Sequence, residues 1–373
     1  MQVPTFLLER NQTLFENTVD INLTESGVHA ATVGDLVPET ERDALAGIAL
    51  GYGYTEGTPA LRQAIADWHP GAGADNVFVG TGTSEANLIA MMTLASKGEH
   101  IVVVTPNFMQ IDGMARALSV EVTQVALKAE DDWQPDAATV TKAIRPGKTA
   151  FVTLCDPNNP TGVAMRADRR RALSEATERA GVWLLVDEIY RGSEIDGGPD
   201  ATSWGLGDKV MVTGGLSKSF GCPGLRIGWC LAPPQIVAEM HRRQDYTTIG
   251  TGPLAQDLAH RALQEPLRSQ LLHRGQAILA QGRKRVADWV ANNEGWNWVK
   301  PDASGQAFIA YPMPVRSSEL VEALRKETGV FVCAGDWFGI DGHVRLGFGV
   351  DASELEEGLR RFDRFLMDHY GAA

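Results

Sequence analysis

The sequence has few cysteines, no long apolar run and fewer positive than negative charges. Its four cysteines are scattered along 373 residues without a Cys-x-x-Cys pair, so we expect reduced thiols and no disulfide framework. The longest apolar runs, such as 182–186, are far shorter than the ~20 residues needed to cross a bilayer. The first residues also lack the basic flank and apolar core of a signal peptide. These absences predict a cytoplasmic protein without a membrane segment.

The charge balance disfavours nucleic acid as a partner. Lys and Arg number 34 against 47 Asp and Glu, so the formal net charge is −13. Such a field repels phosphate backbones and anionic membranes. Hydrophobic residues make up 44% and charged residues 22% of the chain, which are the proportions of an ordinary folded protein. We therefore expect a folded chain that acts on small molecules.

Short apolar runs alternate with helical patterns through the first two thirds of the chain. We expect strands at 77–80, 101–104, 150–154, 182–186, 209–213 and 227–231, and helices between them at 86–94, 140–144 and 169–180. This alternation predicts an α/β fold, a mostly parallel sheet covered by helices on both faces. The uninterrupted apolarity of 101–104 and 182–186 agrees, because strands buried on both faces carry no polar alternation.

The pattern changes after residue 251. A long helix is expected at 268–293, followed by a mixture of short strands and helices that indicates a smaller α+β unit. We therefore predict a large domain at 41–251 and a small C-terminal α+β domain at 252–373. Residues 1–40 fit neither pattern and are expected either to form an arm or to pack on the small domain.

Common nucleotide and metal signatures are missing. The sequence has no Gly-x-x-x-x-Gly-Lys-Ser/Thr and no His-Glu-x-x-His, and the run from Gly80 to Gly82 lacks the third glycine of a dinucleotide fingerprint. The eight histidines show no metal-ligand spacing. The sequence thus disfavours a zinc or NAD enzyme, and we expect no metal.

Unusual loops follow several of the expected strands, at the edge where open α/β sheets bind ligands. These loops read Gly80-Thr-Gly-Thr-Ser-Glu-Ala-Asn87, Thr105-Pro-Asn-Phe108, Asp156-Pro-Asn-Asn-Pro-Thr-Gly162, Val186-Asp-Glu-Ile-Tyr190, and Gly214-Gly-Leu-Ser-Lys-Ser-Phe-Gly221 followed by Pro223-Gly-Leu-Arg-Ile-Gly-Trp229. In this order they resemble the class I and II aminotransferases of fold type I, enzymes that depend on pyridoxal 5′-phosphate (PLP). The resemblance runs from about Tyr52 to Arg345 and implies a seven-stranded large domain, a smaller C-terminal domain and a homodimer with a shared active site.

The resemblance assigns catalytic roles that suit the chemistry of PLP. Lys218 would form the Schiff base with the cofactor and then move the substrate proton. PLP withdraws electrons only while its pyridine nitrogen is protonated, which requires a buried carboxylate beside it, and Asp187 matches that position. Asn159 and Tyr190 match the residues that hydrogen-bond the phenolic oxygen of the cofactor.

Other residues match the positions that hold the rest of the cofactor. Gly82 and Thr83 lie at the expected start of a helix, whose free N–H groups and dipole favour a phosphate, and Arg226 would add a fixed cation. The resemblance implies that Tyr52 of the partner subunit reaches the same phosphate. Phe108 matches the aromatic residue that stacks on the ring, although a phenylalanine in this place also suits core packing.

Substrate contacts are expected from both ends of the chain. Arg345 matches the arginine that binds the substrate α-carboxylate, with Asn159 beside it. The segment Asn22-Leu-Thr-Glu-Ser-Gly-Val-His29 is similar to that of capreomycidine synthases, PLP enzymes that cyclise a hydroxylated arginine. Gly27 would then let the backbone approach the substrate, and His29 is either an acid/base near the substrate side chain or a structural residue. Glu9 is a candidate partner for a cationic side chain.

One departure from the family pattern concerns the phosphate. Three residues before the lysine the family usually has Ser or Thr, and this sequence has Gly215. Ser217 is a different position, so another donor is needed or the cofactor binds more weakly.

The sequence therefore predicts a PLP-dependent aminotransferase that acts on an α-amino acid and a 2-oxo acid. The alternative is a PLP-dependent elimination enzyme, cyclase or oxidase acting on arginine or a hydroxyarginine. A PLP-sensing regulator is a remote alternative, because only about forty residues precede the Tyr52 region and the net charge of −13 disfavours DNA.

Overall fold

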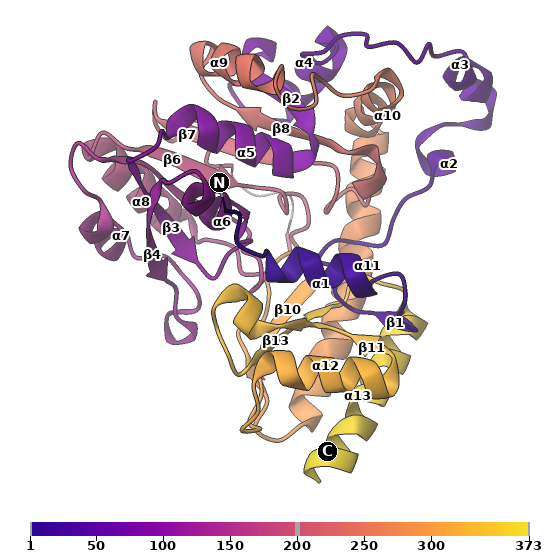
Figure 1. Cartoon of the computed structure of the whole chain (residues 1–373). Coiled ribbons are helices and arrows are strands. Elements are labelled where there is room, and N and C mark those ends of the chain that lie inside the picture. The colour runs from indigo at the N-terminus through magenta and orange to yellow at the C-terminus, as the bar shows by residue number, and fades with distance from the viewer. Residues whose placement is uncertain (1, 198–201, 372–373) are drawn as a thin grey trace.

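The computed structural model describes residues 2–197 and 202–371, and its main feature is a sheet of seven strands (Figure 1). The strands lie in the order β2-β8-β7-β6-β5-β3-β4. Their bounds are β2 Val77–Thr81, β3 His100–Thr105, β4 Glu121–Ala126, β5 Thr149–Cys155, β6 Trp183–Asp187, β7 Val210–Gly215 and β8 Ile227–Leu231. Of these strands β8 pairs antiparallel with β2 and β7, and the other pairs are parallel. The predicted α/β class with a mostly parallel sheet is confirmed.

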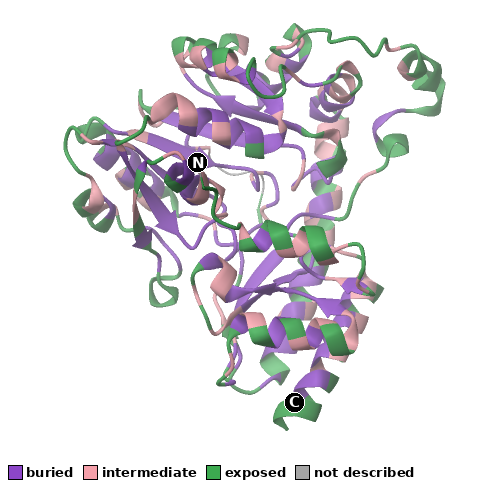
Figure 2. Cartoon of the chain, viewed as in Figure 1, coloured by how far each residue is buried: buried purple, intermediate pink, exposed green. Residues whose placement is uncertain are grey.

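Alternate side chains of the strands enter separate hydrophobic cores on the two faces of the sheet. In β3, Ile101 and Val103 belong to one core, whereas Val102 and Val104 belong to the other. Successive side chains of a strand point to opposite faces, so a strand covered on both sides must be apolar at every position. Figure 2 shows the result as central strands that are buried, with exposed residues on the outer sides of the helices.

Helices cover both faces of this sheet (Figure 1). On one face lie α5 Gly82–Leu94, α6 Gln110–Ala117 and α9 Pro234–Gln244, and on the other α4 Pro59–Trp68, α7 Ala137–Ala143, α8 Ala167–Arg179 and α10 Pro253–Leu263. Short 3-10 turns are η1 Glu39–Glu41, η2 Ala74–Asn76, η3 Ala129–Asp131, η4 Pro223–Leu225 and η5 Gly335–Phe338. The start of α4 shows the local cause of one boundary: Thr58 accepts a hydrogen bond from the Leu61 N–H and Pro59 occupies the first turn, where its missing N–H costs nothing.

The C-terminal third forms a second sheet with a core of its own. The sheet has the order β12-β13-β10-β9 and is antiparallel. Its strands are β9 Asn297–Trp298, β10 Gln306–Ala310, β12 Cys333–Ala334 and β13 His343–Gly347, and the helices of this part are α11 Leu267–Asn292, α12 Ser317–Thr328 and α13 Ala352–Tyr370. The mixture matches the α+β pattern expected here, whereas the domain boundaries after residues 40 and 251 stay predictions.

The N-terminal segment crosses between the two parts. Helix α1 Leu7–Phe15 precedes β1 Ile21–Asn22, which pairs parallel with β11 Val330–Phe331 near the C-terminal sheet. The chain then passes through α2 Val33–Leu36 and α3 Arg42–Ala46 on the outside of the molecule before it reaches α4 (Figure 1).

The sheet extends further than the sequence pattern predicted. The edge strand β4 was missed because its side chains are mostly exposed or half-buried, so it lacks the apolar run that marks the central strands. Among the helices of residues 2–197 and 202–371, none is both long and apolar enough to span a bilayer.

Candidate active site

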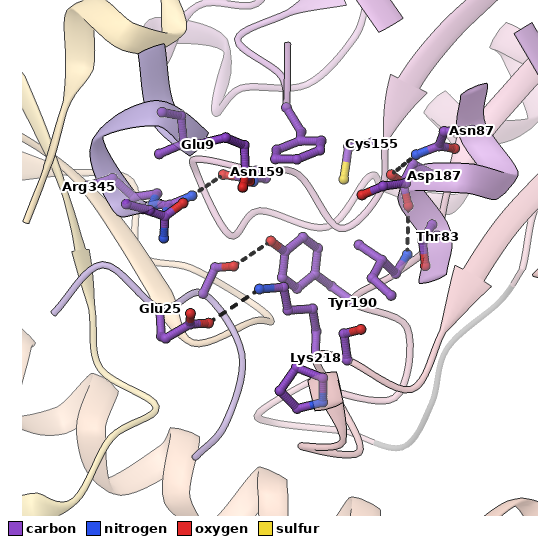
Figure 3. Close-up of a pocket in the computed structure, with 18 of the residues that line it drawn as sticks. Glu9, Glu25, Thr83, Asn87, Cys155, Asn159, Asp187, Tyr190, Lys218 and Arg345 are labelled. Atoms are coloured by element: carbon purple, nitrogen blue, oxygen red, sulfur yellow. Dashed lines mark hydrogen bonds and ion pairs between the residues drawn. The ribbon is translucent and has the colours of Figure 1, made fainter. Parts of the chain in front are cut away.

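A cavity of about 310 Å³ lies between the carboxyl ends of the central strands, helix α1 and the segment after β1 (Figure 3). It is lined by Leu8, Glu9, Gln12, Glu25, Ser26, Thr83, Ser84, Asn87, Phe108, Cys155, Asn159, Asp187, Ile189, Tyr190, Ser217, Lys218, Pro223, Arg226 and Arg345. Most of the residues singled out in the sequence therefore meet in one place. Parallel strands bring this about, because the loops that follow them emerge at the same sheet edge.

Asp187 lies buried at the end of β6, where it lines the cavity. Its Oδ2 accepts a hydrogen bond of 2.8 Å from the Asn87 side-chain amide, and its Oδ1 accepts one of 3.1 Å from the Ile189 N–H. The Asn87 carbonyl in turn accepts a bond of 2.7 Å from Thr213 Oγ1. Burial raises the pKa of Asp187 to about 6 although these donors oppose the rise. A carboxylate of this kind is prepared to take a cationic N–H partner in the cavity.

The neighbouring Glu188 points elsewhere. Its carboxylate accepts hydrogen bonds from Thr202 Oγ1 at 2.6 Å and from the Ser203 N–H at 2.5 Å, and it is not among the residues that line the cavity. Its side chain follows the alternation of the strand, as the sequence indicated.

Lys218 lies three residues beyond the end of β7, with its amine in the cavity. The Lys218 Nζ is 3.4 Å from Oε2 of Glu25, which lies in the segment after β1 (Figure 3). Gly27 packs on the backbone of the lysine, because a Cβ at Gly27 would lie 3.0 Å from Lys218 Cα. The backbone of the lysine is thus packed against Gly27, and its amine lies in the cavity.

Tyr190 and Asn159 line the same cavity as this amine. The Tyr190 hydroxyl donates a bond of 2.8 Å to Ser26 Oγ, and burial raises the pKa of Tyr190, so the phenol stays protonated. Asn159 Oδ1 accepts a bond of 2.9 Å from Nη1 of Arg345.

Arg345 comes from β13 in the C-terminal sheet and is 1% exposed. Its Nη2 donates a bond of 2.5 Å to the Thr24 carbonyl, and its guanidinium lies 5.2 Å from the ring centroid of Phe338. The buried Nε has no hydrogen-bond partner in the described part of the chain. A buried N–H without a partner is costly, so a carboxylate bound here would complete the set of bonds.

An anion cradle forms where α5 begins. A Cβ at Gly82 would lie 2.3 Å from Nη2 of Arg226, and a Cβ at Gly228 would lie 2.2 Å from the Thr83 N–H nitrogen. Glycine at both positions therefore lets the Arg226 guanidinium and β8 approach the first turn of the 13-residue helix. The dipole and free N–H groups of that turn, with Arg226 beside them, suit a phosphate.

The structure also explains why glycine stands at position 215, where the family usually has Ser or Thr. The Thr83 hydroxyl donates a bond of 2.9 Å to the Gly214 carbonyl, and a Cβ at Gly215 would lie 2.5 Å from Thr83 Oγ1. A serine at 215 would therefore compete with Thr83 for the same volume. Ser217 lines the cavity nearby and offers a second hydroxyl.

Two candidates from the N-terminal half line the cavity as well. Phe108 follows β3 and packs edge-on against Phe6, with ring centroids 4.9 Å apart. Glu9 reaches the cavity from α1 (Figure 3).

Besides Gly82 of the anion cradle, three other candidates lie outside the lining of this cavity. Tyr52 is 76% exposed. Gly27 supports Lys218 from behind, and His29 lines a different cavity together with Arg285 and Asp351. Within a single chain the structure thus brings none of these three into contact with the cavity.

The sequence pattern gave no role to several residues that line the cavity. Glu25, Ser26, Asn87 and Cys155 are the main examples. Glu25, Ser26 and Asn87 stand inside segments that had been singled out, so proximity to motif residues was the available signal. Cys155 is placed by strand register, because it pairs with Asp187 across β5 and β6.

The geometry fits PLP. A lysine amine, a buried carboxylate with a raised pKa and a cradle at a helix N-terminus all open on one cavity, and these are the partners that the aldehyde, the pyridine nitrogen and the phosphate need.

The comparisons agree with this geometry. The family described as aminotransferase class I and II matches residues 19–362. Capreomycidine synthase from Streptomyces vinaceus is 30% identical over 364 residues, covering 95% of this chain and 91% of that protein. Arginine–pyruvate transaminase AruH from Pseudomonas aeruginosa is 28% identical, covering 83% of this chain and 81% of that one.

Solved structures share the whole architecture. A PLP-dependent aminotransferase from Streptococcus suis 89-1591 superposes with a TM-score of 0.93 at 27% identity, covering 99% of each chain. The PLP-dependent cyclase OrfR has a TM-score of 0.89 at 26% identity, covering 99% of this chain and 98% of that one. The resemblance inferred from the motifs is confirmed: the chain belongs to the class I and II aminotransferases, enzymes whose cofactor is pyridoxal 5′-phosphate.

Proposed function

We propose that this protein transfers the amino group of an α-amino acid to a 2-oxo acid, with Lys218 as the residue that holds PLP covalently. The observation that carries the proposal is the placement of Lys218, Asp187 and the cradle at α5 around one cavity. PLP, when bound, supplies the electron sink that weakens the bonds at the substrate Cα. The protein supplies everything that orients the reaction.

Each residue of the cavity has a role in this proposal. Asp187 keeps the pyridine nitrogen protonated, and Tyr190 and Asn159 hydrogen-bond the phenolic oxygen. Lys218 Nζ takes the proton from the substrate Cα, because it is the basic group of the cavity that can move.

The remaining residues hold the two ends of the reacting molecules. Thr83 and Arg226, with the first turn of α5 opened by Gly82, bind the phosphate, and Phe108 covers the ring. Arg345 binds the α-carboxylate through its planar fork of N–H groups.

We also propose that the enzyme is a homodimer in the cytoplasm. Tyr52 is exposed and does not line the cavity of its own chain, which supports a role for Tyr52 of the partner subunit at the phosphate. The four cysteines are free and buried, which supports a reducing compartment.

The test has two readouts. Borohydride reduction of the PLP-loaded protein, followed by digestion and mass spectrometry, is expected to place the cofactor on Lys218, and Lys218→Ala is expected to lose the label and at least about 10³-fold of activity. Lys97→Ala removes an exposed lysine and serves as the control. Formation of 2-oxo acids from a panel of amino acids completes the assay; a fully loaded protein that yields none contradicts the transfer reaction.

A second candidate reaction is favoured by the similarity to capreomycidine synthase over 95% of the chain and to the cyclase OrfR. In that case the protein eliminates a group from arginine or a hydroxyarginine, or cyclises it, after the same loss of the Cα proton. Incubation with arginine and hydroxyarginines, with and without a 2-oxo acid, separates the two candidates. A cyclic product without a need for the 2-oxo acid favours the cyclase, and an amino product from the added 2-oxo acid favours the transferase.

A further inference from the structure

The cavity is lined by as many cationic as anionic side chains, but two of its carboxylates have no partner assigned by the proposed function. Among the described lining residues the cations are Lys218, Arg226 and Arg345, and the carboxylates are Glu9, Glu25 and Asp187. The proposed function gives Arg226 to the phosphate, Arg345 to the α-carboxylate and Asp187 to the pyridine nitrogen. Glu9 and Glu25 are then left without a cation of the cavity.

Glu25 has a cationic partner only while Lys218 is a free amine. The ion pair of 3.4 Å uses Lys218 Nζ, the atom that would also hold the cofactor, so the lysine cannot do both at once. The Lys218 ammonium, with a smaller contribution from Arg345, lowers the pKa of Glu25, and the carboxylate is ionised at neutral pH. Its side chain is 49% exposed, so it can turn toward a ligand without the cost of leaving a buried site.

Glu9 adds to the same negative wall from α1. Figure 3 places Glu9 on the same side of the cavity as Asn159 and Arg345. The nearby Glu16, which lies one turn past the cavity and does not line it, has its pKa raised by burial and then by repulsion from Glu25 and Glu9. The three carboxylates thus create a local negative potential beside the cavity.

A second feature, the buried Arg345, supports the binding of an anion beside these carboxylates. Arg345 is 1% exposed, and its Nε is aimed at no acceptor in residues 2–197 and 202–371. The Thr24 carbonyl, which accepts the hydrogen bond from Arg345 Nη2, is adjacent in sequence to Glu25. Arg345 also interacts electrostatically with Glu25 across the same cavity, so an anion at Arg345 would lie near the Glu25 carboxylate.

We propose that Glu25, assisted by Glu9, binds the side chain of the substrate, and that this substrate is an α-amino acid with a cationic end group such as a guanidinium. The inference rests on the proposed function, because it assumes that Arg345 takes the α-carboxylate. A guanidinium suits Glu25 because its planar donors pair with a carboxylate through two parallel bonds.

Arginine and citrulline form the decisive pair of substrates, because they have nearly the same shape and differ in the charge of the end group. The wild-type enzyme is expected to consume arginine with a kcat/KM at least about 30-fold above that for citrulline, since a charge-assisted bond contributes about 2 kcal/mol and tenfold corresponds to 1.4 kcal/mol. Glu25→Gln is expected to lower kcat/KM for arginine about tenfold or more and to leave citrulline within about threefold.

Two further measurements separate a substrate contact from an effect on the lysine or on the fold. α-Methylarginine has no Cα proton to lose, so its dissociation constant can be measured from the absorbance of the bound cofactor without turnover; it is expected to rise about tenfold in Glu25→Gln. Glu16→Gln removes a nearby charge outside the cavity and is the matched control, expected to change the arginine-to-citrulline ratio by less than about threefold.

The outcomes are distinct. Equal kcat/KM values for arginine and citrulline in the wild type would overturn the proposal that the substrate has a cationic side chain. An equal loss of kcat/KM for both substrates in Glu25→Gln would also overturn it, because it would mean that Glu25 acts on Lys218. A loss of the same size in Glu16→Gln overturns a direct contact. Failure of every amino acid to react would instead contradict the proposed function itself.

Discussion

The side-chain amide of Asn87 donates a hydrogen bond of 2.8 Å to the carboxylate of Asp187, and both groups are buried. The direction of this bond is fixed from behind, because Thr213 Oγ1 donates to the Asn87 carbonyl at 2.7 Å. The amide therefore presents its N–H₂ to Asp187, and it supports the charged form of a carboxylate that burial disfavours.

Removal of the Asn87 amide is expected to weaken cofactor binding. Asn87→Leu keeps the volume but leaves Asp187 without its side-chain donor, so the charged carboxylate becomes less stable and pairs less well with a pyridine nitrogen. The dissociation constant of PLP, measured by fluorescence titration at pH 7–8, should rise about tenfold, the equivalent of one lost hydrogen bond to a charged group. Thr213→Val removes only the orienting bond and should have a smaller effect. An unchanged constant in Asn87→Leu contradicts the role of the amide.

Replacement of Asp187 by Asn is expected to stabilise the cofactor-free protein at high pH. The pKa of Asp187 is about 6 in the folded protein against 3.8 ordinarily, so the folded state binds the proton more tightly than the unfolded one. Proton binding by Asp187 therefore contributes its full amount to the free energy of unfolding below pH ~4, and this contribution is lost as the pH rises through 6. A shift of about two units corresponds to about 3 kcal/mol.

Urea unfolding of the cofactor-free proteins checks this sign. Asp187→Asn should be more stable than the wild type by about 2–3 kcal/mol at pH 8, and the difference should fall to about half at pH 5. Cofactor-dependent activity of the variant should be lost. A variant that is less stable at pH 8 contradicts the view that Asp187 is held charged at a cost.

A serine at position 215 is expected to conflict with Thr83. The Cβ of that serine would lie 2.5 Å from Thr83 Oγ1, so Gly215→Ser should lower PLP affinity or the melting temperature although it restores the usual family residue. Thr83→Ala removes the hydroxyl in conflict. In the double variant the loss of free energy, of PLP binding or of unfolding, should be smaller than the sum of the losses in the two single variants by about 1 kcal/mol. Additive losses would show that the two positions are independent.

Replacement of Arg345 by Lys should damage substrate binding and spare the cofactor. A lysine cannot supply the fork that reaches Asn159, the Thr24 carbonyl and a carboxylate together. The KM for the amino acid is expected to rise about 10- to 100-fold, while the absorbance titration with PLP stays unchanged. Arg316→Lys, an exposed arginine in the same part of the chain, is the control. Loss of PLP binding in Arg345→Lys would contradict the assignment to the substrate.

Local sequence was sufficient for the framework of the site. The apolar runs at 101–104, 150–154, 182–186 and 209–213 predicted strands of one sheet. The loops after them carry Phe108, Asn159, Asp187 and Lys218, in that order, to one sheet edge, where the structure places all four around one cavity. This worked because a parallel sheet determines where its loops emerge. The roles of these residues in catalysis stay predictions.

Other features depended on partners that are distant in sequence. The edge strand β4 has no apolar run of its own and exists because β3 offers hydrogen bonds. His29 and Glu25 are four residues apart, yet Glu25 faces Lys218 and His29 faces another cavity. No pattern within the segment separates them.

The sequence by itself determined the family, the cofactor and the order of the motif loops, because each depends on residue types at short spacing. Only the tertiary structure decided how charge is distributed in the cavity. The pairing of Glu25 with Lys218 and of Asn87 with Asp187 joins residues 193 and 100 positions apart, and such contacts arise when the N-terminal segment, α5 and the central strands pack together.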